Sequence, residues 1–600
     1  MTDTLIDRRD MAFQLYEVME TQALTGRERF REHSKETFDA VIETADRMAK
    51  EKFANHNSAA DKNEPRFING QVEMLPEVKQ AFDAYADAGF LAGRYDYELG
   101  GLQLPETIMA ACNGFFTAAN PATAGYPFLT TAAANLIRVF GDEGQKTRYL
   151  APMLRGRYSG TMALTEPHAG SSLADLRTSA TPTEQGHYLI RGAKIYISGG
   201  EQSITENIVH MVLARIKGAP AGVKGISLFI VPKFHVDEHG NVGERNGVGL
   251  AGLIHKLGYR GTTSTALSFG DDAPCHGFLV GEPHQGLKYM FQMMNEARIG
   301  VGLGAAVIGY RGYMHSLAYA KDRLQGRRAG EKDPASPQVP IIGHADVRRM
   351  LLAQKALSEG GLSLCLYGAR LMDDQHTHPD PQKRVEAGKL LDLLTPVIKA
   401  WPSEYGPKAN DLAIQVYGGA GYTREYPVEQ CWRDNRLNPI HEGTNGIQAL
   451  DLLGRKIWQD QSHGLQLLMQ AMQIDLQAAT TDRCQQWALS LSETLQQAVK
   501  VTQSLGKTLM GGEVDRALAN AGCYLHLFGH IVVAWMWLRQ ANAAARALGS
   551  ANSDSERSFY QGKLQAAQYF FHWELPTVAQ DLVLLRNQDD TCLNMKSDWF

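Results

Sequence analysis

The spacing of apolar residues changes along the chain, and the first region has the period of α-helices. Between residues 1 and 160 apolar side chains recur every three to four positions, as in the sets Phe38, Ile42, Ala45, Met48 and Val78, Phe82, Tyr85. This spacing places them on one face of a helix. A turn with two glycines interrupts the pattern at Tyr97–Leu102. We therefore expect an N-terminal helical domain over residues 1–160.

From about residue 161 the pattern is typical of β-strands. Short apolar runs are separated by Gly, Pro and Asn, with Arg191–Gly192 dividing the first two: Tyr188–Arg191, Lys194–Ser198, Ile208–Ala214 and Ile226–Val231. Runs of this length and punctuation predict an antiparallel sheet or a small barrel. The pattern ends near Gly281–Pro283, so the expected β-barrel domain spans residues 161–282.

Helical spacing returns at residue 283 and continues to the end. Residues 283–464 predict a helical bundle, interrupted by a polar surface loop rich in Pro and Gly at Gly326–Pro340. Beyond it Leu465, Leu468, Met469, Met472 and Leu476 share one helical face, and Gly511–Gly512 marks a break. The sequence therefore predicts an additional helical domain over 465–600. The expected fold is mainly α with a central β-barrel domain.

Composition agrees with a multidomain globular protein. At about 100–200 residues per domain, 600 residues suggest three or four domains. The chain contains 8 Trp, 22 Tyr and 21 Phe, which excludes a mostly disordered protein. A net charge of −5 gives no indication of nucleic-acid binding.

The cysteines and the apolar runs bear on location. Seven cysteines include no CxxC pair, which favours a reducing cytoplasm and gives no metal-binding pattern. The polar start lacks the apolar segment of a secretory signal. The longest apolar run, Ile531–Leu538, is shorter than the roughly 20 residues that span a bilayer. We interpret it as a buried core helix; a peripheral membrane contact is the alternative. No integral membrane segment is expected.

Two glycine-containing segments could bind a cofactor. Gly300–Gly309 resembles a dinucleotide-binding fingerprint, but that motif needs a preceding strand and the surrounding residues predict helix. Small residues on a tightly packed helix explain this segment better. The segment Met162–Thr178, MALTEPHAGSSLADLRT, opens the β region. Its hydroxyls and exposed backbone N–H groups could bind a heterocycle edge and a pyrophosphate, although such loops are also common as plain turns.

Several segments together resemble the acyl-CoA dehydrogenase family, in order over roughly residues 80–460. TEPHAGSS is similar to the flavin loop TEPGAGSD, and KIYISG at 194–199 to a second flavin segment. NEAR at 295–298 lies where the family has D-x-x-R. QVYGGAGYTREYP at 415–427, Arg433–Asp434 and HEGTNGIQ at 441–448 resemble the remaining family segments. The resemblance implies FAD-dependent oxidation of an acyl-CoA thioester to a trans-2-enoyl-CoA.

The resemblance assigns the catalytic base to Glu442, and its backbone N–H to the thioester carbonyl. A carboxylate needs a raised pKa to act on a weak carbon acid. The alternative is a carboxylate that merely precedes a helix N-terminus. Some relatives carry the base one residue before the arginine of D-x-x-R, which is Ala297 here. Glu296 is one position away, and we interpret it as a contact residue.

The resemblance also assigns the ligand contacts. Substrate contacts fall on Ser171, Asn295, Arg298, Glu442 and Gly443, where Asn295 replaces the usual Asp. Tyr196 stands where the family has Trp and could still stack on a flavin. Arg323 would reach the FAD of a neighbouring subunit. The full set of implied FAD contacts is Leu164, Thr165, Gly170, Ser171, Tyr196, Ile197, Ser198, Arg323, Gln415, Gly418, Gly419, Thr444 and Asn445.

The extension beyond residue 460 resembles a subgroup of about 600 residues that includes 3-methylmercaptopropionyl-CoA dehydrogenases and broad fatty acyl-CoA dehydrogenases. The resemblance implies a fatty acyl-CoA substrate in β-oxidation, an electron-transfer flavoprotein as acceptor, and a homodimer. Alternatives are 3-(methylthio)propanoyl-CoA as substrate, an acyl-CoA oxidase, and a DNA-associated flavoprotein of the same fold. The last class carries a basic C-terminal region, and residues 465–600 show no Lys/Arg block.

Overall fold

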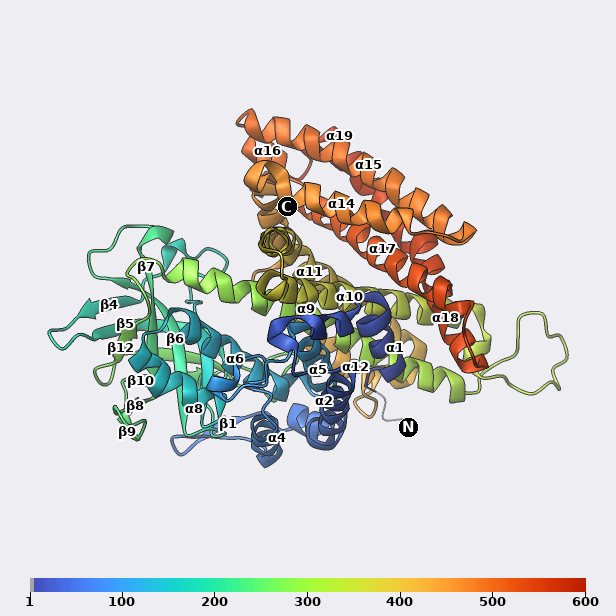
Figure 1. Cartoon of the computed structure of the whole chain (residues 1–600). Helices are drawn as coiled ribbons and strands as arrows, with labels where there is room; N and C mark the ends of the chain where they lie inside the picture. Colours follow the sequence, from blue (N-terminus) through green and yellow to red (C-terminus); the bar gives the residue numbers. More distant parts are fainter. Residues whose placement is uncertain (1–4) are drawn as a thin grey trace. The chain divides into compact units, whose positions relative to one another are not determined.

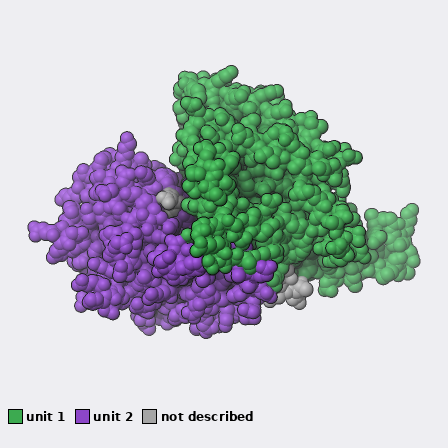
Figure 2. All heavy atoms as spheres, viewed as in Figure 1, with its two compact units in different colours: residues 1–35, 298–600 green, residues 36–297 purple. Residues whose placement is uncertain are grey.

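The computed structural model describes residues 5–600. They form two compact units, one of residues 36–297 and one of residues 1–35 with 298–600 (Figure 2). The four domain boundaries expected from the sequence stay a prediction.

The first helices bury the faces that their spacing predicts. In α2 (Lys35–Met48) Phe38, Ile42 and Ala45 are buried, and in α4 (Pro76–Asp87) Val78, Phe82 and Tyr85 are buried. Two further long helices follow, α5 (Glu106–Ala119) and α6 (Pro121–Phe140). The Asn120 side chain caps α6 by accepting a hydrogen bond from the Thr123 N–H at 3.0 Å.

Eight strands form one sheet that closes into a barrel (Figure 1). β5 pairs with β12, β12 with β7, β7 with β6, β6 with β4, and β4 again with β5. The strands are β3 (Tyr158–Ala163), β4 (Ser179–Pro182), β5 (Tyr188–Ser198), β6 (Asn207–Ile216), β7 (Ile226–Pro232), β10 (Val248–Leu253), β11 (Ser264–Phe269) and β12 (His276–Leu279). The short hairpins β1 (Arg66–Ile68) with β2 (Gln71–Glu73), and β8 (Phe234–Val236) with β9 (Val242–Arg245), lie outside it.

The sheet is a barrel, which is one of the two expected arrangements, and its strands are not all antiparallel. β6 pairs in parallel with both β3 and β4, because longer connections return the chain in the same direction. Burial on both faces explains the apolar stretch Met211–Ala214 within β6. Val209, Met211 and Leu213 pack with the residues of α6, whereas Val212 and Ala214 face a second core inside the barrel.

Tyr188–Arg191 and Lys194–Ser198 are not two strands but one, β5. Gly192, at φ 154°, lets the strand pass close to a neighbour: a Cβ there would lie 2.5 Å from the Thr178 hydroxyl oxygen. Glycine is needed for this close approach and does not end the strand.

The second unit is helical. The candidate base, Glu442, lies in the connection between α12 and α13. The helices of this part of the unit are α9 (Gly286–Asp322), which begins in the first unit, α10 (Ala345–Thr377), α11 (Pro381–Tyr417), α12 (Val428–Asn435) and α13 (Asn445–Gly454). The predicted loop at 326–340 connects α9 and α10. α11 continues through Pro396, Pro402 and Pro407. Proline removes a hydrogen bond to the carbonyl four residues earlier, so Pro402 leaves the Ile398 carbonyl without its usual helical donor.

Gly302 of α9 lies directly against that carbonyl. A Cβ at Gly302 would be 2.0 Å from the Ile398 oxygen, and one at Gly309 would be 3.2 Å from the Gly406 Cα. The glycines of 300–309 therefore permit close packing of α9 and α11, and the expectation that they form no dinucleotide fingerprint is confirmed.

The C-terminal helices surround an apolar one. α14 (His463–Gln477), α15 (Asp482–Met510), α16 (Val514–Leu518), α18 (Asp554–Tyr569) and α19 (Ala579–Asn587) accompany α17 (Ala521–Leu548), and the glycine pair ends α15 as predicted (Figure 1). Within residues 5–600, α17 alone is long and apolar enough to cross a membrane, by length and composition only. However, 83% of its most apolar stretch is buried, including Trp535 and Trp537. This fits the expected core helix.

A buried ionic cluster joins the N-terminal segment to the C-terminal helices. The Lys563 ammonium pairs with Asp10 and, at 2.8 Å, with Glu359; Tyr310 donates a hydrogen bond to Asp10 at 2.9 Å. Lys563, Asp10 and Glu359 are at most 2% exposed at their side chains. The charges compensate each other away from water and fix the segment in place.

Gly302→Ala tests the helix contact. The new methyl group would overlap the Ile398 oxygen, so we expect a loss of about 1–3 kcal/mol in stability, seen as a lower thermal midpoint. Gly562→Ala is the matched control, because Gly562 lies in α18 and a Cβ added there would have no other atom within 4 Å. It should gain up to about 1 kcal/mol from helix propensity. Equal midpoints for the two variants would contradict this account.

Candidate active site

A buried ion pair ties together the two segments expected to bind the flavin. Lys194, from β5, donates hydrogen bonds to the Leu164 carbonyl at 2.8 Å and to the Glu166 carboxylate at 2.9 Å. Glu166 also accepts from the Thr178 N–H at 3.0 Å, and the Ile195 N–H donates to the Thr165 carbonyl at 3.0 Å. These contacts fix the loop after β3 against β5 and bring residues 164–171 beside 196–198.

The charges of this pair are stabilised by each other. Burial lowers the pKa of Lys194 to about 8, and Glu166 opposes that effect. Burial acts to raise the pKa of Glu166, but the ammonium and the Thr178 hydroxyl hold it below its usual value. Lys194 and Glu166 hold the loop through their hydrogen bonds. Within the loop, Thr165 is half-buried, and Gly170 and Ser171 are exposed.

Tyr196 has an unusual conformation for a strand residue. Its φ is +60°, and the register between β5 and β11 shifts at this point, which marks a bulge. The ring is 63% exposed, whereas Ile197 next to it is buried. A non-glycine residue in the left-handed region costs of order 1–3 kcal/mol and is frequent at ligand sites. The bulge turns the Tyr196 ring outward, where a planar ligand could stack on it.

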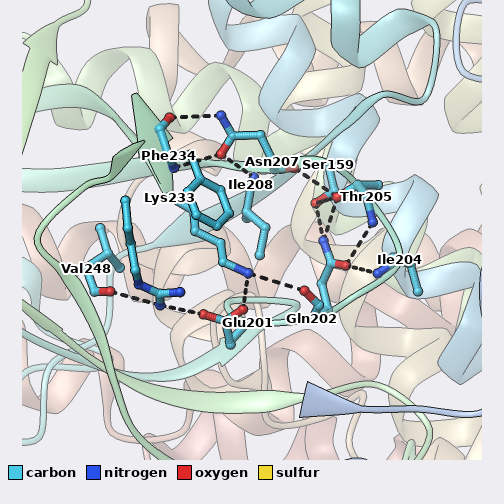
Figure 3. A network of polar contacts seen from close by, with 11 residues as sticks. Ser159, Glu201, Gln202, Ile204, Thr205, Asn207, Ile208, Lys233, Phe234 and Val248 are labelled. Carbon is cyan, nitrogen blue, oxygen red and sulfur yellow. Dashed lines mark hydrogen bonds and ion pairs between the residues drawn. The ribbon is translucent and has the colours of Figure 1, made fainter. Parts of the chain in front are cut away.

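A polar network holds the connection that follows Ser198 (Figure 3). Gln202 donates to the Ser159 hydroxyl at 2.8 Å and to the Thr205 hydroxyl at 2.7 Å. Glu201 pairs with Lys233 and, at 2.9 Å, with Arg245. Glu201 and Gln202 are buried, so the end of the second flavin segment is anchored on β3, on β9 and on Lys233, which lies between β7 and β8.

The contacts expected at a neighbouring subunit's FAD lie together at the ends of α9 and α11. The rings of Tyr319 and Tyr417 stack with centroids 4.0 Å apart, which joins these two helix ends. In the sequence, Arg323 comes shortly after Tyr319, and Gln415, Gly418 and Gly419 lie on either side of Tyr417. All four are exposed, and no atom lies within 4 Å of a Cβ position at either glycine. The site is open to a ligand.

Glu442 lies in a strained turn just before α13. Its φ is +53° and that of Gly443 is +83°. Gln448 donates to the Glu442 carbonyl at 3.2 Å and to the Gly443 carbonyl at 3.3 Å. Thr444 is the N-cap of α13, accepting from the Ile447 N–H at 3.3 Å. Glu442 is therefore not the helix cap; it lies two residues before it, so the structure leaves the helix-dipole alternative open.

Two buried cations act electrostatically on the Glu442 carboxyl. Arg298 is 3% exposed and pairs with Asp451 at 3.2 Å; its Nε has no hydrogen-bond partner within the described chain. Lys399, on α11, is fully buried and donates to the Asn445 side-chain oxygen at 3.1 Å. Burial raises the pKa of Glu442, and Arg298 and Lys399 both oppose that shift. A carboxyl with a raised pKa suits general-base chemistry.

The residue before the base is neutral. Burial, together with the nearby Lys399 charge, lowers the pKa of His441 to about 3. Its Nε2 lies 3.0 Å from the Asn438 side-chain oxygen, and Asn438 donates in turn to Asn435 at 2.8 Å. These buried amides fix the imidazole beside the base without adding a charge.

Glu296 is occupied elsewhere. One carboxylate oxygen accepts from Asn135 at 2.7 Å and the other pairs with Arg94 at 3.1 Å. This agrees with its interpretation as a contact residue and disfavours it as the base. Asn295 lies half-buried in the same turn of α9.

Sequence reasoning missed Lys399 and assigned Asn445 only to FAD. The signal was a lone lysine in the apolar stretch TPVIKAW, which the sequence does not connect to Glu442. The roles assigned to the other site residues stay predictions.

A cavity of about 680 Å³ lies elsewhere in the same unit, beside α11. It is lined by Lys389, Asp392, Lys456 and Asp460 among others, and none of the expected site residues borders it. Lys389 pairs with Asp460 at 2.9 Å and Lys456 with Asp392, so its charges compensate each other. Within residues 5–600 no three His, Cys, Asp or Glu side chains are arranged to hold a metal ion.

Lys194→Met tests the support of the flavin loop. It leaves Glu166 buried without its cation, so we expect a loss of about 3 kcal/mol and faster hydrogen exchange over residues 164–178. The exposed Lys217→Met in the same unit should change neither. Unchanged exchange over 164–178 in the Lys194 variant would contradict the assigned role.

Comparisons with known proteins cover almost the whole chain. Family models match as follows: acyl-CoA dehydrogenase N-terminal domain over residues 35–157, middle domain over 161–271, C-terminal domain over 284–457, and acetyl-CoA dehydrogenase C-terminal like over 468–596.

Two relatives are similar over their full length. The chain is 35% identical to 3-methylmercaptopropionyl-CoA dehydrogenase of Ruegeria pomeroyi, covering 94% of each chain. It is 34% identical to the broad-specificity linear acyl-CoA dehydrogenase FadE5 of Mycobacterium tuberculosis, covering 98% of each.

A solved structure confirms the expected fold. Caenorhabditis elegans ACDH-11, in complex with C11-CoA, superposes with a TM-score of 0.78 at 17% identity, covering 99% of this chain and 92% of that one. On these matches, with helices, barrel, helical bundle and C-terminal extension in the same order, the chain belongs to the acyl-CoA dehydrogenase family.

Proposed function

We propose that the protein catalyses the FAD-dependent α,β-dehydrogenation of an acyl-CoA thioester to a trans-2-enoyl-CoA, with Glu442 as the base. The half-buried Glu442 carboxyl carries this proposal. It lies in a strained turn, its pKa is raised by burial, and two buried cations help it to ionise. This combination is what removal of a weakly acidic α-proton requires.

The residues of the chain fit FAD. Tyr196 presents an open ring face from its bulge, and the loop after β3 offers exposed Ser171 and Gly170 backed by the Lys194–Glu166 pair. Gly418 and Gly419 allow close approach of a diphosphate, and Arg323 supplies a positive charge. When bound, FAD supplies the acceptor for the hydride that leaves the β-carbon. A solved relative from Bacillus anthracis is an acyl-CoA dehydrogenase complexed with FAD.

Glu442 and the residues around it remove the α-proton and bind the thioester. The carboxylate takes the α-proton, and its backbone N–H holds the thioester carbonyl so that negative charge on the oxygen is stabilised. Gly443 cannot be larger, since a Cβ there would lie 2.6 Å from the Gln448 amide nitrogen. Gln448 and the Thr444 cap hold the turn, and Arg298 with Asn295 supports the CoA chain.

The substrate class follows from the relatives. We propose a fatty acyl-CoA in β-oxidation; 3-(methylthio)propanoyl-CoA is a second candidate, favoured by the 35% identity to a dehydrogenase named for that thioester. We further propose an electron-transfer flavoprotein as acceptor, a cytoplasmic location, and a homodimer in which the C-terminal helices cover surface that a tetramer would use. A light-scattering mass near four protomers would contradict the dimer.

An anaerobic titration tests the reaction. The purified holoenzyme should lose its flavin absorbance on addition of acyl-CoAs of graded length or of methylthiopropionyl-CoA, and the thioester that bleaches it fastest identifies the substrate class. In Glu442→Gln the rate of bleaching should fall by about 10²–10⁴-fold, because the base is removed.

Two variants serve as controls. Glu386→Gln on the surface of α11 should bleach as wild type does, and Glu296→Gln should still bleach, because Glu296 is not the base. Absence of bleaching in wild type with every thioester, while flavin is bound, would contradict a dehydrogenase. Rapid peroxide formation during aerobic turnover would indicate an oxidase.

A further inference from the structure

Lys399 is a buried cation whose direct hydrogen-bond partner is neutral. It lies in the middle of α11, its side chain is fully buried, and its ammonium donates to the Asn445 side-chain oxygen at 3.1 Å. Burying an ammonium is costly unless an opposite charge compensates it, and an amide oxygen supplies no net charge. Asn445 therefore orients the ammonium but does not compensate its charge.

Glu442 is the carboxylate that acts electrostatically on Lys399. The charged groups that act on Lys399 are Glu442, from the turn before α13, and Arg298, from α9. His441 is the further titratable group beside it, and Glu404 lies on the far side of Asn445 at 3.4 Å. Arg298 already has a carboxylate partner, Asp451 at 3.2 Å, whereas Lys399 has an amide. Both cations act on Glu442, Arg298 more strongly than Lys399, and of the two only Lys399 has an amide as its side-chain partner.

We propose that Lys399 is a positioning residue for the base: its ammonium, oriented by Asn445, keeps the Glu442 carboxyl ionised and ready to accept the α-proton. This rests on the proposed function. Asn445 is three residues after Glu442 and opens α13, so the ammonium is fixed relative to the turn by two helices rather than by a mobile side chain. Asn445 then serves the base and not only the FAD.

The titration behaviour of the pair supports this role. Burial lowers the pKa of Lys399 to about 7, and Glu442 opposes that shift. Burial raises the pKa of Glu442, and Lys399 opposes that in turn. Below pH 7 Lys399 is therefore charged and favours the ionised form of Glu442. This is the pH range in which the Glu442 carboxyl would otherwise become protonated.

The pH dependence of kcat/KM tests the proposal, with the holoenzyme and the acyl-CoA that bleaches wild type fastest. Activity should fall as pH drops through the pKa of Glu442. Lys399→Met removes the positive charge, so this acidic limb should move to higher pH by about one unit or more, with activity largely recovered at high pH. Lys399→Gln, which keeps a donor for Asn445 without the charge, should show the same shift.

Lys456→Met is the matched control. Lys456 is also a buried lysine, but it follows α13 and pairs with Asp392 in the separate cavity. Its variant should keep the wild-type limb. A second readout needs no turnover: the infrared band of the protonated carboxyl that is missing in Glu442→Gln should appear at higher pH in both Lys399 variants.

The outcomes separate two failures. If Lys399→Met and Lys399→Gln lose activity equally at all pH values, or leave both the limb and the infrared band unmoved, Lys399 has only a packing role and the proposal is overturned. If wild type shows no turnover at any pH, the proposed function fails instead, and the infrared titration still decides whether Lys399 acts on Glu442.

Discussion

The site depends on a half-buried carboxyl group, Glu442, whose pKa is raised by desolvation. Desolvation makes Glu442 a stronger base than an exposed glutamate, but it also favours the neutral form that cannot accept a proton. Buried cations resolve this conflict, because Arg298 and Lys399 lower the cost of ionisation without exposing the group. The strained backbone at Glu442 and the Gln448 contacts then fix where the carboxyl lies. One turn thus provides both the raised pKa of the base and the contacts that fix its position.

The packing of α9 on α11 fixes the positions of these charges. Lys399 lies next to Ile398, whose carbonyl is left free by Pro402 and is covered by Gly302 of α9. The same close approach brings α9 and α11 together along the stretch that carries Arg298 and Lys399. At their far ends the Tyr319–Tyr417 stack joins the residues expected to contact FAD. In the other unit, the Lys194–Glu166 pair fixes the flavin loop against β5.

Local pattern was enough for much of the fold. The buried faces of α2 and α4 follow from apolar spacing, and the motif strings locate the base and the flavin loop. Long-range pairing was not accessible. The parallel β3–β6 pairing depends on how the chain returns, and β5 runs through Gly192 because Thr178, 14 residues earlier, lies against it. Lys399 looked like an interruption of an apolar helix, since only the packing of α11 on α13 gives it a partner.

The central claim is that Glu442 removes the α-proton, and hydrogen exchange at the substrate tests it without the hydride step. An acyl-CoA with sulfur in place of the β-carbon cannot be dehydrogenated, so incubation in D₂O isolates proton removal. The account predicts that wild type exchanges an α-hydrogen of this thioester, as seen by NMR, and that Glu442→Gln does not. Undiminished exchange in Glu442→Gln would show that another group is the base.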